Sequence, residues 1–584
     1  MNISNKINDI SVHSVSILSF GLFYIWMSIK ATFIFIQFST FEILSVAVVF
    51  LGLFVSLSKI FLNSIFKEKV YFSIENIIVS VLIVLLLVLF SDIIIVHWMK
   101  PGYYYPFFPL LDVELAINWN RDSAFHSTNV QSILNFAYPS IGLHDTPVMI
   151  YHTLSHYIDA FIILITGVEV FDSYGLFFYF KTVMFISSVL IFITCIHKKN
   201  NMLFFIVSLI ISLALIIGSN GIAIGSHGLW FTSILVIISF YKIFTIVIKE
   251  EFTYKNFSII CLFLIIIGLG KISTGFMYAV FIGFILLFRF PKNKYVYLTG
   301  SIWIVFFYYF QRLMIVNHTE LNISMDIIKK TYQYMLSPSD VLVSIYISML
   351  VIFIQIILLS KEKKFDILIP MVISLVIMSI VIKLNPNMSA TDIYYFEHGY
   401  SSILILVILY NFFKVDRTKY IIIVLILILF GKLLTIPDKI LNNPSKHYLD
   451  IKYKNKLDNN RELYSFREEL KKYMKKNKLT KKNTLLYLPK EIYRNELSKF
   501  KGRGRRGFLV YSITGVPLIY GVSSLANDYG HADYDKSSLW LSIKDFTKQK
   551  ACQVNSDKNI VIVNSVLEKN FSMIKCKEIN NERR

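Results

Sequence analysis

Charged residues are scarce in this chain. They make up 17% of its 584 residues, whereas about 25% is usual for a soluble globular domain. The shortage is uneven, because long apolar runs fill residues 1–436 while residues 437–584 are charged and mixed. This contrast excludes an ordinary soluble protein. It predicts a transmembrane domain at 1–436 and a separate domain at 437–584.

Cysteine is also rare, which excludes a dense disulfide framework. The chain has four cysteines, of which Cys195 and Cys261 lie in apolar runs and are expected to be packing residues. The other two, Cys552 and Cys576, lie in the terminal domain. We expect them to form a disulfide if that domain lies in an oxidising space, and to be free thiols if it does not.

The N-terminus lacks a recognisable cleavable signal, since its first apolar run is too long and no small-residue cleavage site follows. We expect this run to remain as a signal anchor. Reading about 20 apolar residues per helix, we predict a polytopic α-helical membrane protein with about thirteen transmembrane helices. The predicted spans are 13–36, 41–62, 76–97, 174–196, 202–218, 229–248, 256–270, 274–290, 294–311, 339–360, 365–384, 398–413 and 419–436.

The net charge of +21 has an explanation other than nucleic-acid binding. Cytoplasmic loops of membrane proteins are rich in Lys and Arg, and nearly every second loop here is basic. With an odd number of spans, the N-terminus is cytoplasmic and the terminal domain is periplasmic or extracellular, in a multi-pass protein of the cell (inner) membrane. The basic loops lie at 67–69, 197–199, 249–255, 292–294, 361–364 and 414–419.

Three of the loops on the outer side are long, at 98–173, 312–338 and 383–399. Within the first, residues 150–168 are amphipathic rather than fully apolar, so we expect a helix lying in or dipping into the outer interface. A fourteenth span is the competing interpretation.

Polar residues of the first outer loop are the leading site candidates. Asp122 and His126 are spaced to share a helix face, and so are His152 and His156. A carboxylate beside imidazoles is suited to act as a general base, and the four residues together are also suited to hold a divalent metal ion. The simpler interpretation is that they hydrogen-bond one another and anchor the loop.

The third outer loop offers a second group of candidates. Asp392, Glu397 and His398 lie beside two tyrosines, and aromatic surfaces with a few polar groups suit sugar rings. An ordinary interfacial loop is the alternative. Asp92, near the outer end of the third span, is either a further carboxylate of the site or a residue facing headgroup water.

The first outer loop resembles that of GT-C-type integral membrane glycosyltransferases. The resemblance covers the overall plan of the chain and, in residue detail, about 50 positions. The family more often carries two acidic residues separated by one other residue. Asp122 is not part of such a pair, and in this loop only Asp112 and Glu114 have that spacing. The matching residues are Asp122, Phe125, His126, Gly142, Pro147, Tyr151, His152, His156, Thr166 and Gly167.

The resemblance implies a GT-C-like fold and a reaction class. Such enzymes move a sugar from a polyprenyl-phosphate carrier at the outer face to a glycan or lipid-linked acceptor. The loop carboxylate, here Asp122, serves as base, and basic residues or a metal ion hold the carrier phosphate. Candidates for phosphate binding are Arg121, Lys271 and Arg312. For Lys271 a snorkelling membrane anchor is the alternative, and for Arg312, at the end of a span, a snorkelling flank residue is the favoured interpretation.

The terminal domain shows alternating patterns typical of a small α/β domain. Residues 462–477 predict an amphipathic helix, and 484–489, 508–513 and 559–564 predict strands. Nothing in it forms a nucleophile–base motif or a nucleotide-binding loop, so we expect it to cover the site or to bind the acceptor.

Two other functions fit a chain of this type. A repeat-unit polymerase of O-antigen or capsule usually relies on arginine-rich outer loops, and those loops here hold few arginines. A polysaccharide or lipid transporter places ionisable groups near the bilayer midplane, whereas Lys30, Lys181 and Lys242 are expected nearer the ends of their spans. Surface-polysaccharide assembly by sugar transfer is therefore the leading hypothesis.

Overall fold

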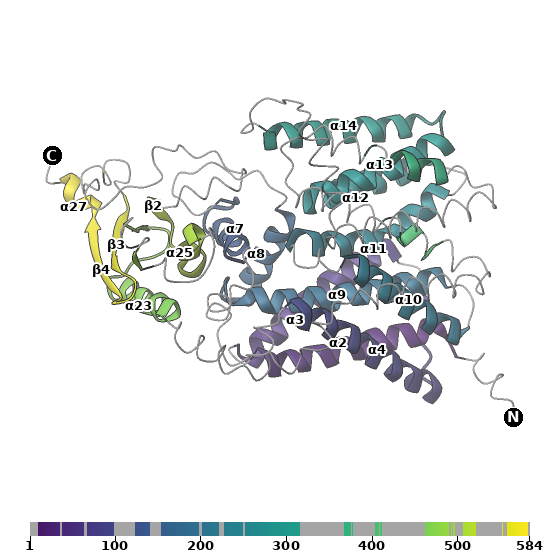
Figure 1. Ribbon diagram of the computed structural model, residues 1–584, viewed down its shortest axis with the longest axis horizontal. Coiled ribbons are helices and arrows are strands. Elements are labelled where there is room, and N and C mark those ends of the chain that lie inside the picture. Colours follow the sequence, from purple (N-terminus) through teal and green to yellow (C-terminus); the bar gives the residue numbers. More distant parts are fainter. Residues whose placement is uncertain are drawn as a thin grey trace, which may run out of the picture.

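The fold is mainly helical, with one small sheet near the C-terminus (Figure 1). The structure is a computed structural model. This model describes residues 10–35, 38–62, 67–98, 123–140, 153–197, 201–220, 227–248, 252–315, 367–374, 462–489, 506–520 and 557–581, with isolated positions between 377 and 410, between 492 and 496, and at 552.

The apolar runs up to residue 315 form helices at the predicted places. Six of these helices are long and apolar enough to cross a membrane, which supports a membrane protein. The four later predicted spans lie mostly outside the described residues, so the count of thirteen is not confirmed. The helices are α2 (Val12–Ile34), α3 (Thr40–Leu62), α4 (Ile74–Trp98), α9 (Ser173–Ile196), α10 (Met202–Asn220), α11 (His227–Ile248), α12 (Tyr254–Gly270), α13 (Ile272–Arg289) and α14 (Lys294–Ile315).

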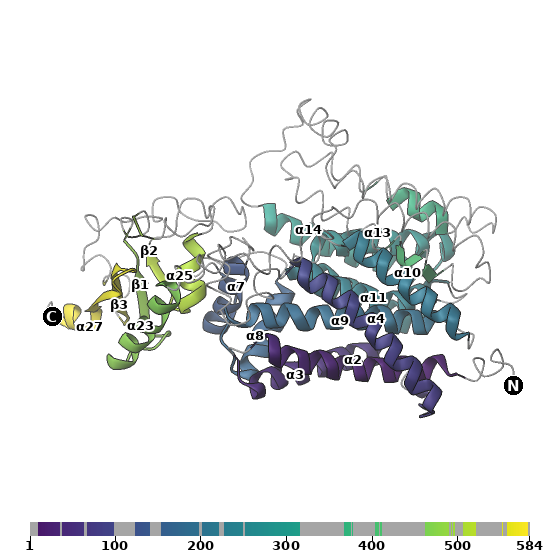
Figure 2. The ribbon, with the colours of Figure 1, turned by 60° about the horizontal axis from the view of Figure 1, so that its bottom comes forward.

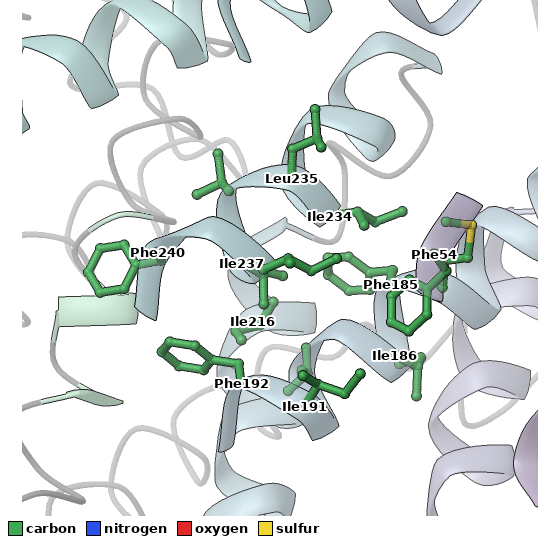
Figure 3. Close-up of a cluster of buried hydrophobic side chains, with 14 of the residues drawn as sticks. Phe54, Phe185, Ile186, Ile191, Phe192, Ile216, Ile234, Leu235, Ile237 and Phe240 are labelled. Atoms are coloured by element: carbon green, nitrogen blue, oxygen red, sulfur yellow. The ribbon is translucent and has the colours of Figure 1, made fainter. Parts of the chain in front are cut away.

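Helix α9 lies at the centre of the bundle. It packs against α2, α3, α4, α10 and α11, and nearly all of its side chains are buried. Figure 3 shows how Phe185 and Phe192 of α9 meet the branched side chains of α11 and Phe54 of α3. Elsewhere on the bundle large apolar side chains such as Phe33 and Leu85 are exposed. An apolar exterior around a well-packed interior suits a hydrocarbon solvent.

Two shorter helices of the first outer loop stand at one end of the bundle. They are α7 (Ser123–Phe136) and α8 (Leu154–Thr166). With 13 residues, α8 is about 20 Å long, which is too short to cross a core of about 30 Å. Its apolar side chains Phe161 and Leu164 are exposed, while His156 and Asp159 are buried. Residues 154–166 are thus an amphipathic helix rather than a full span, with its polar side facing the protein.

The terminal domain contains a four-stranded sheet in the order β2-β1-β3-β4. Strand β1 pairs in parallel with both β2 and β3, and β3 pairs antiparallel with β4. The helices accompanying the sheet make this an α/β arrangement, as predicted. The elements are α23 (Glu462–Lys476), β1 (Thr484–Tyr487), α25 (Arg506–Thr514), β2 (Leu518–Tyr520), β3 (Asn559–Ser565), β4 (Asn570–Lys575) and α27 (Cys576–Asn581).

The strand predicted at 508–513 is wrong, because these residues belong to helix α25. A short run of branched and aromatic residues fits a buried helix as well as a strand. Here Gly515, with a φ of 67°, follows the helix directly, and its amide bonds back to the carbonyl of Tyr511. A glycine in this left-handed conformation is a common helix stop.

The two faces of the sheet are buried differently. Leu486 and Val561 lie on the face covered by α23 and α25. Leu485 and Ile560 lie on the other face, as alternation along a strand requires. The second face also holds the disulfide between Cys552 and Cys576. The predicted pairing is confirmed, and it is consistent with an oxidising compartment.

The terminal domain lies beyond the end of the bundle where α7 and α8 stand (Figures 1 and 2). The first outer loop contributes to the core of this domain, since Phe171 is buried there and Phe136 packs against it. The loop and the terminal domain, more than 300 residues apart in sequence, therefore share one apolar core.

Candidate functional site

Two histidines of the first outer loop meet between α7 and α8. Nδ1 of His126 and Nε2 of His156 are 2.9 Å apart, and both side chains are buried. The ring of Tyr174, from the start of α9, is stacked at 6.4 Å from that of His126. Since one nitrogen must donate and the other accept, at least one of the two facing nitrogens is unprotonated. This pair fixes the first turn of α7, which begins directly after Asp122 in the sequence.

One turn further along α8, a buried ion pair joins this loop to the bundle. Nζ of Lys181 lies 2.8 Å from Oδ1 and 2.9 Å from Oδ2 of Asp159. Both side chains are almost completely buried, at 2% and 4% exposed. Lys181 is the ninth residue of α9, about 12 Å along the helix. It therefore lies deeper in its span than its expected place near the end.

The C-terminal end of α7 docks onto the terminal domain. The amide of Asn135 donates to the hydroxyl of Tyr511, at 3.1 Å, and to the carbonyl of Gly515, at 2.8 Å. Burial raises the pKa of Tyr511 to about 12, so its phenol stays protonated at neutral pH. Helix α7 thus connects the histidine pair at one end with the terminal domain at the other.

Two ion pairs strengthen this docking from the segment between α8 and α9. Arg467 of α23 lies 2.9 Å from Asp172, and Lys471 lies 2.9 Å from Glu169. Burial raises the pKa of Asp172, although the Arg467 guanidinium opposes the shift. Burial also acts to raise the pKa of Glu169, but the hydrogen bond and charge of Lys471 outweigh it and lower that pKa. Both contacts orient α23 against the loop.

The histidine pair does not fit a metal centre. Two imidazole nitrogens bound to one tetrahedral zinc ion are about 3.3 Å apart, and here the facing nitrogens are at hydrogen-bond distance. Within the described part of the chain, no group of three His, Cys, Asp or Glu residues is placed to hold a metal ion. Asp122 and His152, the other predicted ligands, lie outside the described residues.

Lys271 lies between α12 and α13, where a single extended residue separates the two helices. Its φ and ψ are −157° and 111°, and its side chain is 3% exposed. This burial within the protein does not fit a side chain that snorkels into the headgroup layer. The turn lies at the same end of the bundle as the terminal domain, because α9 starts at that end and the helices that follow alternate in direction.

The remaining predicted site residues divide into two groups. Asp92 forms an ion pair with Lys30 of α2, at 2.5 Å, so its carboxylate has a partner within the bundle. The others lie outside the described residues: Arg121, Asp122, His152, Asp392, Glu397 and His398. Of the two residue pairs predicted in the first outer loop, the structure therefore brings together His126 and His156, one residue from each.

Sequence reasoning missed the polar residues that link the elements. Asp159 carried a signal, because it interrupts an apolar run three residues after His156, on the same helix face. Asn135 and Arg467 carried none, since each looks like an ordinary polar residue of an amphipathic helix. Their partners lie hundreds of residues away.

Replacing Asn135 by Ala tests the docking of α7. The change leaves the buried Tyr511 hydroxyl and the Gly515 carbonyl without this donor, so we expect a loss of about 1–3 kcal/mol in the free energy of unfolding. The backbone amides of α25 should exchange their hydrogens faster in this variant than in the wild type. Asn564→Ala, at an exposed position of β3, is the matched control and should change stability by less than about 0.5 kcal/mol. Equal effects of both variants would contradict the docking role.

The chain was compared with protein-family models, with curated proteins and with solved structures, and none of these comparisons gave a match.

Proposed function

We propose that this protein is a membrane glycosyltransferase. It transfers a sugar from a polyprenyl-phosphate-linked donor to a glycan or lipid-linked acceptor at the outer face of the cell membrane, in cell-surface polysaccharide assembly. The observation that carries the proposal is the histidine pair, which holds the start of α7, directly after Asp122 in sequence. Helix α7 stands between the terminal domain and the helix bundle (Figure 2). The resemblance to GT-C-type enzymes rests on the same residues.

The topology that this function needs is supported by the arrangement of the helices. The predicted basic loops at 67–69 and 197–199 follow the ends of α3 and α9 that point away from the terminal domain. If those loops face the cytoplasm, the terminal domain with its disulfide lies outside. A lipid-linked donor then enters from the bilayer with its phosphate at the level of α7 and α8.

The reaction assigned to this site is a displacement at the anomeric carbon. The carboxylate of Asp122 takes the proton of the acceptor hydroxyl, whose oxygen bonds to the anomeric carbon as the bond to the carrier phosphate breaks. The phosphate leaves with the electron pair, and positive groups nearby stabilise it. His126 and His156 position the helix that follows the base.

Reconstitution tests the proposal. The full chain in lipid nanodiscs is incubated with polyprenyl-phosphate sugars and with lipid-linked oligosaccharide acceptors, and products are identified by mass spectrometry. We expect an extended glycan and an equal amount of released polyprenyl phosphate. Movement of an intact lipid-linked glycan across vesicles, with no covalent product, would contradict the proposal.

A transport function is the second candidate, and one observation favours it. The ion pair of Asp159 and Lys181 is buried inside the bundle, and ionisable residues within membrane helices often line transport paths. Repeat-unit polymerisation is a further alternative that shares the donor and the membrane face. It differs in its product, a chain lengthened by whole repeat units.

A further inference from the structure

The start of α13 carries two buried hydroxyls that have no partner in the described part of the chain. They belong to Ser273 and Thr274, whose side chains are 3% and 2% exposed. Other buried threonines of the bundle donate to the carbonyl four residues earlier. Thr182, Thr194 and Thr299 all do so, at 3.0, 2.8 and 2.7 Å. Ser273 and Thr274 thus differ from the hydroxyls that donate a hydrogen bond to a carbonyl of their own helix.

These hydroxyls lie in the first turn of an 18-residue helix. The first bond within α13 runs from the amide of Gly275 to the carbonyl of Lys271, so the amides of residues 272–274 precede the helical ladder. Side chains on a helix tilt toward its N-terminus, so both hydroxyls tilt toward the end of the helix that holds those amides. The N-terminus of a helix also carries positive partial charge.

The N-terminal end of α13 is closely packed against neighbouring helices. A Cβ placed on Gly270 would lie 2.5 Å from Oγ1 of Thr232 on α11, and one on Gly275 would collide with the backbone of Gly268. Helices α11, α12 and α13 therefore meet closely around the turn. Lys271, itself buried, adds an ammonium group on the residue before the helix. Amides, hydroxyls and an ammonium group together are the chemistry that binds phosphate.

We infer that the start of α13, with Ser273, Thr274 and Lys271, binds the phosphate of a lipid-linked substrate. The inference rests on the proposed function for the identity of the lipid, but the anion site itself stands on the geometry of α13. Helix α8, which carries His156, packs against both α11 and α12. The phosphate site and the candidate base region therefore belong to neighbouring elements at the same end of the bundle.

Thermal unfolding of the detergent-purified full chain tests this site. Three probes are compared: a polyprenyl monophosphate, phosphatidic acid and inorganic phosphate. Thr274→Val removes the hydroxyl but keeps the shape, and Thr274→Ser keeps the hydroxyl. We expect the Tm of unliganded Thr274→Val to equal or exceed that of the wild type, because an unsatisfied hydroxyl is lost. Its affinity for polyprenyl phosphate should fall about tenfold or more, while Thr274→Ser stays close to wild type.

Ser58→Ala is the matched control, since Ser58 on α3 is also a buried hydroxyl without a partner among the described residues. It should keep the full Tm increase with polyprenyl phosphate. If Thr274→Val binds polyprenyl phosphate as tightly as the wild type, the site is wrong and the proposed function still stands. If Thr274→Val loses only phosphatidic acid or inorganic phosphate, the anion site is right and its assignment to the sugar carrier is wrong. Failure of the wild type to bind any of the three overturns the site.

Discussion

Replacing Lys181 by Met should destabilise the protein by about 3–5 kcal/mol, the usual result of leaving one charge of a buried ion pair alone. Both carboxylate oxygens of Asp159 lie within 2.9 Å of the ammonium group, and neither side chain reaches solvent. The Met side chain fills a similar volume but cannot compensate the carboxylate. Thermal unfolding in detergent measures the loss, and Lys242→Met, at a half-buried position of α11, is the control with a smaller expected effect.

The double variant Asp159→Asn with Lys181→Met separates structure from function. Replacing both charges of a buried pair is often neutral for stability, so the double variant should regain most of what Lys181→Met loses. Sugar transfer should return with it if the pair only anchors α8 to α9. If stability returns and transfer or transport does not, the pair takes part in the function, which would favour the transport candidate.

The membrane helices could be predicted because their signal is local. A long apolar run must form a helix in a bilayer, where every backbone group has to be bonded within its own segment. The run at 174–196 became α9, Ser173–Ile196, with its ends almost unchanged. In the terminal domain the signal was weaker, since strand β1 was found but the run at 508–513 proved to be a helix. There the deciding feature was Gly515, whose role depends on its backbone conformation.

The candidate site could be predicted only in part, because its contacts are not local. His126 and His156 were singled out as members of two different pairs, each defined by spacing on one helix. The structure instead joins them across two helices, a contact that no spacing rule on a single helix describes. The sequence gives no indication that the hydroxyls of Ser273 and Thr274 matter. They stand out only because, within the described residues, they are buried without a hydrogen-bond partner.

Docking of the terminal domain explains why the first outer loop matters to the whole chain. Helix α7 is held at its start by His156 and at its end by Tyr511 and Gly515. A helix fixed at both ends sets the position of the chain that precedes it more firmly than a free loop does. Preorganisation of this kind lowers the cost of placing a catalytic group. If Asp122 is the base, as proposed, the terminal domain supports the site through its contacts with α7.

Replacing Asp122 by Asn should lower the rate of sugar transfer by about 10²–10⁴-fold, the usual contribution of a general base. An amide cannot take the acceptor proton, but it keeps the size and hydrogen-bonding shape of the side chain. Stability should therefore stay near that of the wild type, and the affinity for polyprenyl phosphate should be retained. Single-turnover rates with a polyprenyl-phosphate sugar in nanodiscs measure the loss.

Asp112→Asn is the matched control, because Asp112 and Glu114 form the acidic pair in the loop that is commoner among GT-C-type enzymes. It should keep most of the transfer rate if Asp122 is the base. A large loss in Asp112→Asn with little change in Asp122→Asn would move the base to the pair, upstream of α7. The histidine pair would then lack a role next to the chemistry, since the helix that it fixes begins directly after Asp122 and eleven residues after Asp112. Comparing these two variants thus tests the base and the proposed purpose of α7 together.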